Sequence, residues 1–407
     1  MALGDRQLER LNALLVEILP ANGFYASKLG DAVGPFSSLA EFAEAVPFTT
    51  KEELAADHEA HPPYGTTHTF PLNHYVRFHQ TSGTRGNPLI WMDDVEGWDY
   101  FIVSGWMWVW HRAEIGVGDC AFFPFSFGPF LGFWGAYEAA ARIGIRVVPG
   151  GGMTSEDRVR LLERCGANVL CCTPTYALRL AEVAKELNVD AAALPVEKVL
   201  VCGEPGGSIA EVRTRIEEAW GATVIDHHGM TEVGPVTVTA PGHRDLLEVC
   251  HEAYLAEVIN PETLEPLSVG GMGELVLTTL GRAGSPLLRY RTGDLVRVVE
   301  LDGEPAFAGG IIGRSDDMVV IRGVNVYPSA VEAVVRSVEG ISEYEVQISQ
   351  REALPEMSLR VEGSADAAET LQKRMREVLS LRVPVEAVAP GTLPVFEVKA
   401  KRWKVGS

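Results

Sequence analysis

The sequence is poor in cysteine, and none of its six cysteines forms a C-x-x-C pair. Most of them lie in apolar runs such as Val199–Cys202. This usage argues against a disulfide framework and predicts reduced core cysteines in a cytoplasmic protein. Because a polar helical pattern, rather than an apolar run, follows Met1, we expect no signal peptide.

Basic residues are also scarce. Lysine and arginine number 35 against 55 acidic residues, which gives a formal net charge of −20. An acidic chain is a poor partner for nucleic acid and for anionic membrane surfaces, so we expect neither. The longest apolar stretch, Tyr100–Trp110, is too short to cross a bilayer. A small phosphorylated substrate stays compatible with this charge, because a loop can hold one locally.

The chain has 407 residues, of which 46% are apolar, enough for two or three domains. Between residues 134 and 226 helical patterns alternate with short, fully apolar strands, which is typical of a parallel sheet covered by helices. After Val233 the pattern becomes rich in strands, and a small α+β pattern begins after Gly313–Asp317. We predict an α/β protein with a large N-terminal domain (1–314) and a small, mobile C-terminal domain (315–407).

The segment Thr81–Pro88 combines two glycines, hydroxyl side chains and one arginine after a strand-like run. Glycines let consecutive N–H groups converge on one point, and hydroxyls add donors, so such a loop suits phosphate oxygens. It is not a Walker loop, because no Gly-Lys-Ser/Thr closes it. Taken alone, an ordinary surface turn is the better interpretation.

Four later segments carry further chemistry, each with an ordinary alternative. Asp226–Glu232 follows a strand and suggests a ligand-binding βα turn, or only a helix cap. Tyr290–Asp294 places a carboxylate after a tight turn, where it could bind a ribose diol or merely stabilise the turn. Gly313–Pro328 carries a charged turn at the domain boundary, and Lys399–Arg402 is a basic segment that could be a solvated tail.

The order and spacing of these segments resemble the adenylate-forming superfamily of acyl-CoA synthetases, adenylation domains and luciferases. The resemblance is greatest to the phenylacetate–CoA ligases and spans essentially the whole chain. Gly313–Pro328 matches the family pattern nearly residue for residue, as do Val46–Leu54, Gly150–Thr154 and Thr173–Tyr176.

The resemblance implies that a carboxylic acid and Mg·ATP form an acyl-adenylate with release of pyrophosphate, and that coenzyme A then takes the acyl group. It gives roles to Thr231 at the α-phosphate, Glu232 at Mg²⁺ and Lys399 as the catalytic lysine of the adenylating pose. Asp294 would bind the ribose, with help from Arg314, and Asp316 would be the hinge of the small domain. The β- and γ-phosphates would lie against Thr81, Ser82, Gly83, Thr84, Arg85 and Gly86.

The remaining expected contacts to nucleotide, acid and coenzyme A follow from the same resemblance. Gly323 would line the coenzyme A tunnel. The acyl pocket would use the aromatic segment that contains Phe127, Gly128 and Phe130, although ordinary core packing explains those rings equally well. The other residues expected around the nucleotide and the acid are Gly203, Glu204, Pro205, Asp226, His227, His228, Gly229 and Met230.

Several residues depart from the family pattern. Arg85 stands where threonine is usual, His228 replaces a tyrosine that packs on adenine, and Val398 stands where glycine is common. These departures leave room for another acceptor: a carrier-protein thiol, an amine or activated nitrite. A catalytically inactive nucleotide-binding homologue is disfavoured because Glu232, Asp294, Arg314 and Lys399 are retained together. We expect Mg²⁺ but no zinc. The resemblance further implies a homodimer, although no sequence signal marks an interface.

Overall fold

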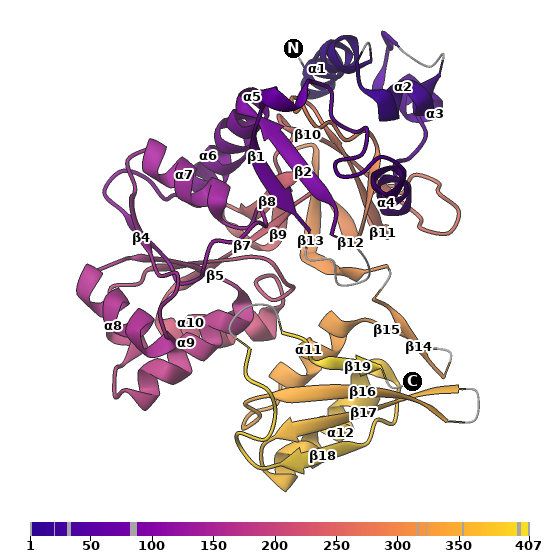
Figure 1. The fold of residues 1–407 in the computed structure, drawn as a ribbon. Helices are drawn as coiled ribbons and strands as arrows, with labels where there is room; N and C mark the ends of the chain where they lie inside the picture. Colours follow the sequence, from indigo (N-terminus) through magenta and orange to yellow (C-terminus); the bar gives the residue numbers. More distant parts are fainter. Residues whose placement is uncertain are drawn as a thin grey trace. The chain divides into compact units, whose positions relative to one another are not determined.

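The computed structural model describes residues 2–19, 21–30, 34–81, 88–315, 317–322, 324–351, 354–396 and 400–405 (Figure 1). The chain forms two compact units. The first contains Met1–Gly152 and His227–Ala308, and the second contains Met153–Asp226 and Gly309–Ser407. The sequence predicts a boundary between independently folding domains at residue 314. The division into two compact units does not test that boundary, which stays a prediction.

The first unit begins with helices that pack against a segment much later in the chain. Leu11, Leu15 and Ile18 on one face of the first helix are buried together with Leu280 and Leu288. The expected capping box is confirmed, because the Thr50 hydroxyl accepts from the backbone N–H of Glu53 while the Glu53 carboxylate accepts from that of Thr50. These helices are α1 (Leu3–Ile18), α2 (Gly23–Leu29), α3 (Leu39–Ala45) and α4 (Lys51–Ala60).

A short hairpin and a helical segment follow. β1 (Tyr75–Gln80) pairs with β2 (Ile90–Asp94) in antiparallel register. The chain then passes through α5 (Val95–Asp99) into the π-helix η2 (Tyr100–Trp106). A π-helix widens the turn and often marks a functional site. The segment ends with α6 (Met107–Arg112), β3 (Cys120–Phe123), α7 (Trp134–Arg142) and β4 (Arg146–Pro149), and β3 and β4 are parallel.

The rest of the first unit is antiparallel sheet, as the strand-rich pattern after Val233 predicts. β10, β11 and β12 form one ladder, and β7, β8, β9 and β13 pair in sequence at their described registers. The strands are β7 (Thr223–Met230), β8 (Gly234–Ala240), β9 (His243–Val249), β10 (Tyr254–Ile259), β11 (Met272–Thr279), β12 (Tyr290–Leu301) and β13 (Glu304–Arg314).

The second unit contains the predicted parallel sheet. β5, β6 and the first half of β7 pair in parallel, and their strands are almost completely buried. This arrangement confirms the α/β fold class, and Figure 1 shows α8, α9 and α10 beside these strands. The elements are α8 (Ser155–Cys165), β5 (Val169–Cys172), α9 (Pro174–Glu186), η3 (Ala191–Ala193), β6 (Lys198–Val201) and α10 (Ala210–Trp220).

The C-terminal part of the second unit is a small α+β region with its own core. Its four-stranded sheet has the order β18-β17-β16-β19, and its apolar face packs against α11 and α12 around Val346, Leu359 and Leu371. The elements are β14 (Val319–Ile321), β15 (Val324–Val326), α11 (Pro328–Arg336), β16 (Tyr344–Arg351), β17 (Leu354–Glu362), α12 (Ala365–Leu379), β18 (Val385–Val388) and β19 (Trp403–Val405).

Two local expectations are wrong. Asp226–Glu232 is not a βα turn, because β7 continues to Met230 and returns through a hairpin turn into β8. Asp294 does not follow an isolated turn but lies inside β12. A register irregularity opposite Glu274 and a positive φ of 76° at Gly293 explain the turn-like sequence. In both places long-range strand pairing overrides the local signal.

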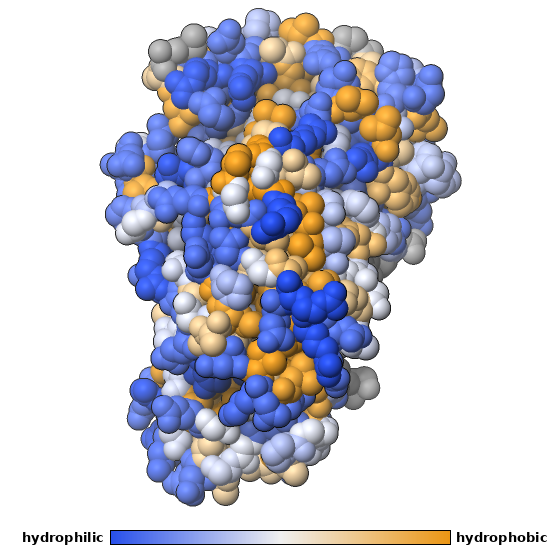
Figure 2. Space-filling model, turned by 90° about the vertical axis from the view of Figure 1, so that its left-hand side faces the viewer, coloured by the Kyte–Doolittle hydropathy of each residue, from blue (hydrophilic) through white to orange (hydrophobic). Residues whose placement is uncertain are grey.

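No helix in the described ranges is both long and apolar enough to cross a membrane. Figure 2 shows one face of the molecule, where hydrophilic side chains predominate and apolar ones form patches between them.

A buried ion pair joins distant parts of the first unit. The Arg282 Nε donates to Asp93 Oδ1 at 2.6 Å, and both side chains are fully buried. The Arg282 Nη1 donates to the Glu232 carbonyl at 2.6 Å, and its guanidinium lies over the Phe101 ring. Because removal of one partner leaves an uncompensated buried charge, this pair is much harder to replace singly than an exposed one.

We therefore expect Arg282→Met to lower the free energy of unfolding by about 3–5 kcal/mol. The exposed Arg6–Glu252 pair is the matched control, and Arg6→Met should cost less than about 1 kcal/mol. Denaturant unfolding followed by tryptophan fluorescence measures both. Equal effects of the two substitutions would contradict a special role of the buried pair.

Candidate active site

Thr81 closes the base of the glycine-rich loop. Its N–H donates to the Leu89 carbonyl at 2.9 Å, and its hydroxyl accepts from the Leu89 N–H at 3.0 Å. The expected phosphate contacts Ser82, Gly83, Thr84, Arg85 and Gly86 lie outside the described residues. Thr81 and Leu89, which flank the loop, are thus joined by two hydrogen bonds next to β1 and β2.

His228 and Asp294 meet although they are far apart in the sequence. The His228 Nε2 lies 3.0 Å from Asp294 Oδ2, so the ring donates to the carboxylate. The Asp294 side chain is 7% exposed, and its N–H donates to the Thr292 hydroxyl. The histidine that departs from the family pattern therefore fixes one oxygen of the carboxylate expected at the ribose.

Glu232 pairs with a lysine that the sequence reasoning did not select. Lys51 Nζ lies 3.2 Å from Glu232 Oε1, and the glutamate side chain is 5% exposed. Lys51 sits at the first residue of α4, directly after the Thr50 cap. The only signal for it was the match of Val46–Leu54 to the family pattern. The predicted metal ligand thus has a cation beside it in this unit.

His227 points to the face of β7 opposite that of His228, because side chains alternate along a strand. Its Nδ1 hydrogen-bonds to the Thr237 carbonyl at 2.6 Å, so Nδ1 carries the proton. The Trp106 ring centroid, at the end of η2, is 4.4 Å from that of His227. Burial lowers the pKa of His227 to about 3, which keeps the ring neutral.

The aromatic segment divides between core and surface. Phe122 and Phe123 are buried, whereas Phe127 is half-buried and Phe130 is 39% exposed. The Phe127 ring lies 4.5 Å from that of Trp134, whose indole N–H donates to the Gly128 carbonyl. Core packing therefore accounts for the first part of the segment only. Phe127 also packs on Tyr137, and Phe127 and Phe130 keep part of their surface exposed.

In the second unit Glu204 joins two backbone segments. Its carboxylate accepts from the Thr175 N–H at 2.8 Å and from the Ala400 N–H at 3.1 Å. Thr175 lies in the first turn of α9, where backbone N–H groups have no partner within the helix. Gly203 and Pro205 flank Glu204 in the same loop.

Two further predicted residues belong to the second unit. Asp226 Oδ2 accepts a hydrogen bond from the Ser208 hydroxyl at 2.5 Å. A Cβ at Gly310 would come within 2.5 Å of Ser208, so this strand needs glycine there. Arg314 ends β13, and its carbonyl accepts from the Asp317 N–H, as the turn expected at Arg314–Asp317 requires.

The predicted site residues thus fall into three groups. The hinge, tunnel and catalytic positions Asp316, Gly323 and Lys399 lie outside the described residues. Gly203, Glu204, Pro205, Asp226 and Arg314 belong to the second unit. The first unit holds Thr81, Phe127, Gly128, Phe130, His227, His228, Gly229, Met230, Thr231, Glu232 and Asp294.

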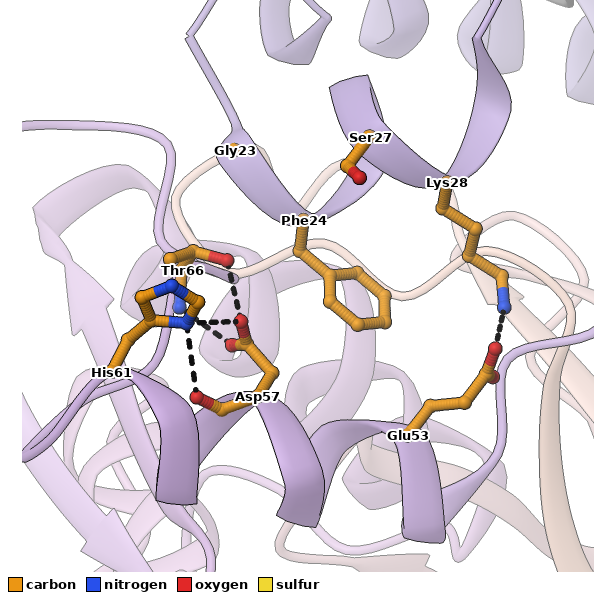
Figure 3. Close-up of a pocket in the computed structure, with 8 residues that line it drawn as sticks. All are labelled: Gly23, Phe24, Ser27, Lys28, Glu53, Asp57, His61 and Thr66. Carbon is orange, nitrogen blue, oxygen red and sulfur yellow. Dashed lines mark hydrogen bonds and ion pairs between the residues drawn. The ribbon is translucent and has the colours of Figure 1, made fainter.

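A depression between α2 and α4 lies apart from these residues (Figure 3). Its charged side chains pair with one another: Lys28 binds Glu53 at 2.5 Å, and Asp57 accepts from the N–H and hydroxyl of Thr66. His61 lies 3.1 Å from Asp57. Because its polar groups satisfy one another, this depression is a poor candidate for the chemistry.

A metal centre built from protein side chains alone is not present within the described ranges, where no three His, Cys, Asp or Glu residues gather suitably. Glu232 would accordingly need oxygen ligands from a substrate to complete a metal's coordination.

Comparison with known proteins identifies the family. The AMP-binding enzyme family matches residues 38–282, and the AMP-binding enzyme C-terminal domain matches residues 323–404. The chain is a member of the AMP-binding enzyme family. It is 31% identical to the phenylacetate-coenzyme A ligase of Pseudomonas putida, over 98% of this chain and 93% of that protein.

A second relative and a solved structure agree. The phenylacetate-coenzyme A ligase of Thermus thermophilus is 32% identical, over 89% of this chain and 81% of that protein. The crystal structure of 2-hydroxyisobutyryl-CoA ligase with 2-HIB-AMP, in the postadenylation state, superposes with a TM-score of 0.93 at 30% identity. The superposition covers 99% of this chain and 89% of the chain of that ligase. This AMP-binding enzyme is therefore an AMP-forming acid–thiol ligase similar to the phenylacetate–CoA ligases.

The buried histidines of this AMP-binding enzyme predict acid sensitivity. Burial lowers the pKa of His79 from 6.5 to about 4. The unfolded chain therefore takes up a proton below pH 6.5 that the folded protein resists, and stability falls as the pH drops from 6.5 toward 4. His79→Phe should reduce this slope by about 1.4 kcal/mol per pH unit.

Denaturant unfolding across this pH range measures the slope. His243, which is exposed, provides the control, and His243→Gln should leave the slope unchanged. An unaltered slope in His79→Phe would contradict the prediction.

Proposed function

We propose that this protein activates an aryl or arylacetic acid as its acyl-adenylate, with Mg·ATP, and transfers the acyl group to coenzyme A. One observation carries the proposal: a buried carboxylate, Asp294, is fixed by His228 in the same unit as the buried Glu232. The first carboxylate suits a ribose diol and the second suits a hard cation. The relatives named above supply the reaction class.

The nucleotide would lie against Asp294 and His228. His228 occupies one carboxylate oxygen of Asp294, which orients the group toward two adjacent hydroxyls. Arg314 would assist at the ribose, and Thr231, in the turn after β7, would donate its hydroxyl to the α-phosphate. The glycine-rich loop that begins at Thr81 would hold the β- and γ-phosphates.

Glu232 fits a Mg²⁺ ion. It is a buried carboxylate, an oxygen ligand of the type that Mg²⁺ prefers, and phosphate oxygens and water would complete the shell. When bound, the ion would neutralise phosphate charge during attack by the carboxylate. Lys51 keeps Glu232 charge-balanced, and its ammonium would favour the anionic triphosphate.

The acid would lie against the face of β7 that carries His227 and Gly229, next to Trp106 and Phe127. Aromatic side chains suit a planar acid, and two of the relatives are named for phenylacetate. These side chains would exclude water and hold the substrate carboxylate near the α-phosphate. Positioning of this kind supplies a large part of the rate acceleration in such a reaction.

Transfer to coenzyme A would require the small domain, 315–407, to rotate about Asp316. Lys399 would contact the α-phosphate and the carboxylate in the adenylating pose and then withdraw, while Gly323 would line the tunnel for the thiol. The solved 2-hydroxyisobutyryl-CoA ligase supports this alternation, because postadenylation, open and thioesterification states of it are known. Glu204, which accepts from Ala400 N–H, would hold the residue next to Lys399.

ATP–pyrophosphate exchange tests the proposed function. Labelled pyrophosphate should enter ATP only in the presence of an aryl or arylacetic acid and Mg²⁺. Coenzyme A should then give a thioester detectable by mass spectrometry. Absence of exchange with every acid, and with nitrite, would refute the adenylation. Exchange without thioester would point to a carrier-protein thiol, an amine or another acceptor.

Lys399→Ala should abolish adenylation and largely spare thioester formation from supplied acyl-adenylate, because the lysine acts in one pose only. Lys401→Ala, which changes an exposed lysine two residues further on, is the matched control and should leave both half-reactions unchanged. Rapid-quench assays of each half-reaction measure the outcome. Equal loss of both in Lys399→Ala would count against the two poses.

A further inference from the structure

Among the described residues, only one of the two ring nitrogens of His227 makes a hydrogen bond. Its Nδ1–H donates to the Thr237 carbonyl, and a carbonyl only accepts, so the other nitrogen, Nε2, carries a lone pair and no proton. His227 is 3% exposed, and Nε2 makes no hydrogen bond within the described residues. The low pKa that burial gives the ring keeps it uncharged throughout the neutral range, and the bond to Thr237 selects this tautomer.

The space in front of Nε2 is kept open by a glycine. A Cβ at Gly229 would stand 3.3 Å from Nε2, and 2.7 Å from the Gly234 carbonyl oxygen. Any side chain there would press against the lone pair and the hairpin backbone. Nε2 keeps some exposed surface, whereas Nδ1 of the neighbouring His228 is buried without a partner among the described residues.

The surroundings of His227 are aromatic and supply no donor to it. Trp106 lies 4.4 Å away, centroid to centroid, and its ring packs at 5.9 Å against Phe133. Phe133 in turn lies 5.0 Å from Phe125. Once a ligand covers this acceptor and excludes water, leaving it without a donor costs about 1–3 kcal/mol. A ligand that carries a donor would avoid that cost.

We infer that His227 is a specificity-determining residue, whose Nε2 accepts a hydrogen bond from a hydroxyl or amino substituent on the aromatic acid. This inference rests on the proposed function, since it assigns the acid to this face of β7. It names a narrower substrate class: aromatic acids that bear an O–H or N–H donor. A site that offers a buried acceptor rejects an analogue that leaves the acceptor unpaired.

Exchange assays with matched acids test the inference. The probes are phenylacetate and benzoate, their ortho, meta and para hydroxy and amino derivatives, and the methoxy and methyl analogues, which match size but donate nothing. For at least one ring position the donor acid should exceed its methoxy and methyl analogues in kcat/KM by about 10–100-fold.

Variants locate the effect. His227→Leu should reduce the preference for the donor acid to within about threefold, because it removes the acceptor. His227→Gln, whose amide can still donate to Thr237 and accept from a ligand, should retain part of the preference. The matched control is His79→Leu, which removes another buried histidine whose ring stacks on Trp98, and it should leave the preference intact.

The outcomes distinguish failure of the inference from failure of the proposed function. Exchange that shows no preference for any donor acid in the unmodified protein would overturn the inference and leave the proposed function standing. A preference that persists in His227→Leu would also overturn it. Failure of every acid to support exchange would overturn both. Because the first comparison uses the unmodified protein, the inference stays testable even where a variant does not fold.

Discussion

The Arg282 guanidinium is the constraint on which the first unit depends. It is fully buried, and a charge in that position is stable only when its partners are fixed. It therefore binds Asp93 at the end of β2 and the carbonyl of Glu232 in the turn after β7. One side chain thus ties the strand that follows the glycine-rich loop to the residue expected to bind metal. The Trp91 and Phe101 rings enclose it.

The two faces of strand β7 carry different sets of polar and aromatic side chains. His228 and the partner it fixes, Asp294, lie on one face, while His227 and the Trp106 ring lie on the other. Alternation along a strand makes this separation automatic, so in the proposed function adjacent residues would serve different ligands. Gly229 then removes a side chain where the backbone of β8 comes close. Under the proposed function, this strand would hold both reactants on a single rigid element.

Sequence patterns were sufficient where structure is local. The parallel strands between residues 169 and 226 and the Thr50–Glu53 capping box follow from short-range periodicity and side-chain chemistry. The turn expected at Asp226–Glu232 was wrong, since pairing of β7 with β8 decides that backbone. The carboxylates Asp294 and Glu232 could be selected from motifs. Their partners could not, because the Lys51–Glu232 contact spans 181 residues and depends on tertiary packing alone.

The two hydrogen bonds between Thr81 and Leu89 have a consequence for variation. They close the glycine-rich segment at its base, so the register of β1 and β2 is set by residues outside it. Because the Thr81 hydroxyl accepts from the Leu89 N–H, a residue without a side-chain oxygen at position 81 would leave one of these two bonds unmade. The side chain at position 81 is thus tied to the backbone of Leu89, eight residues away.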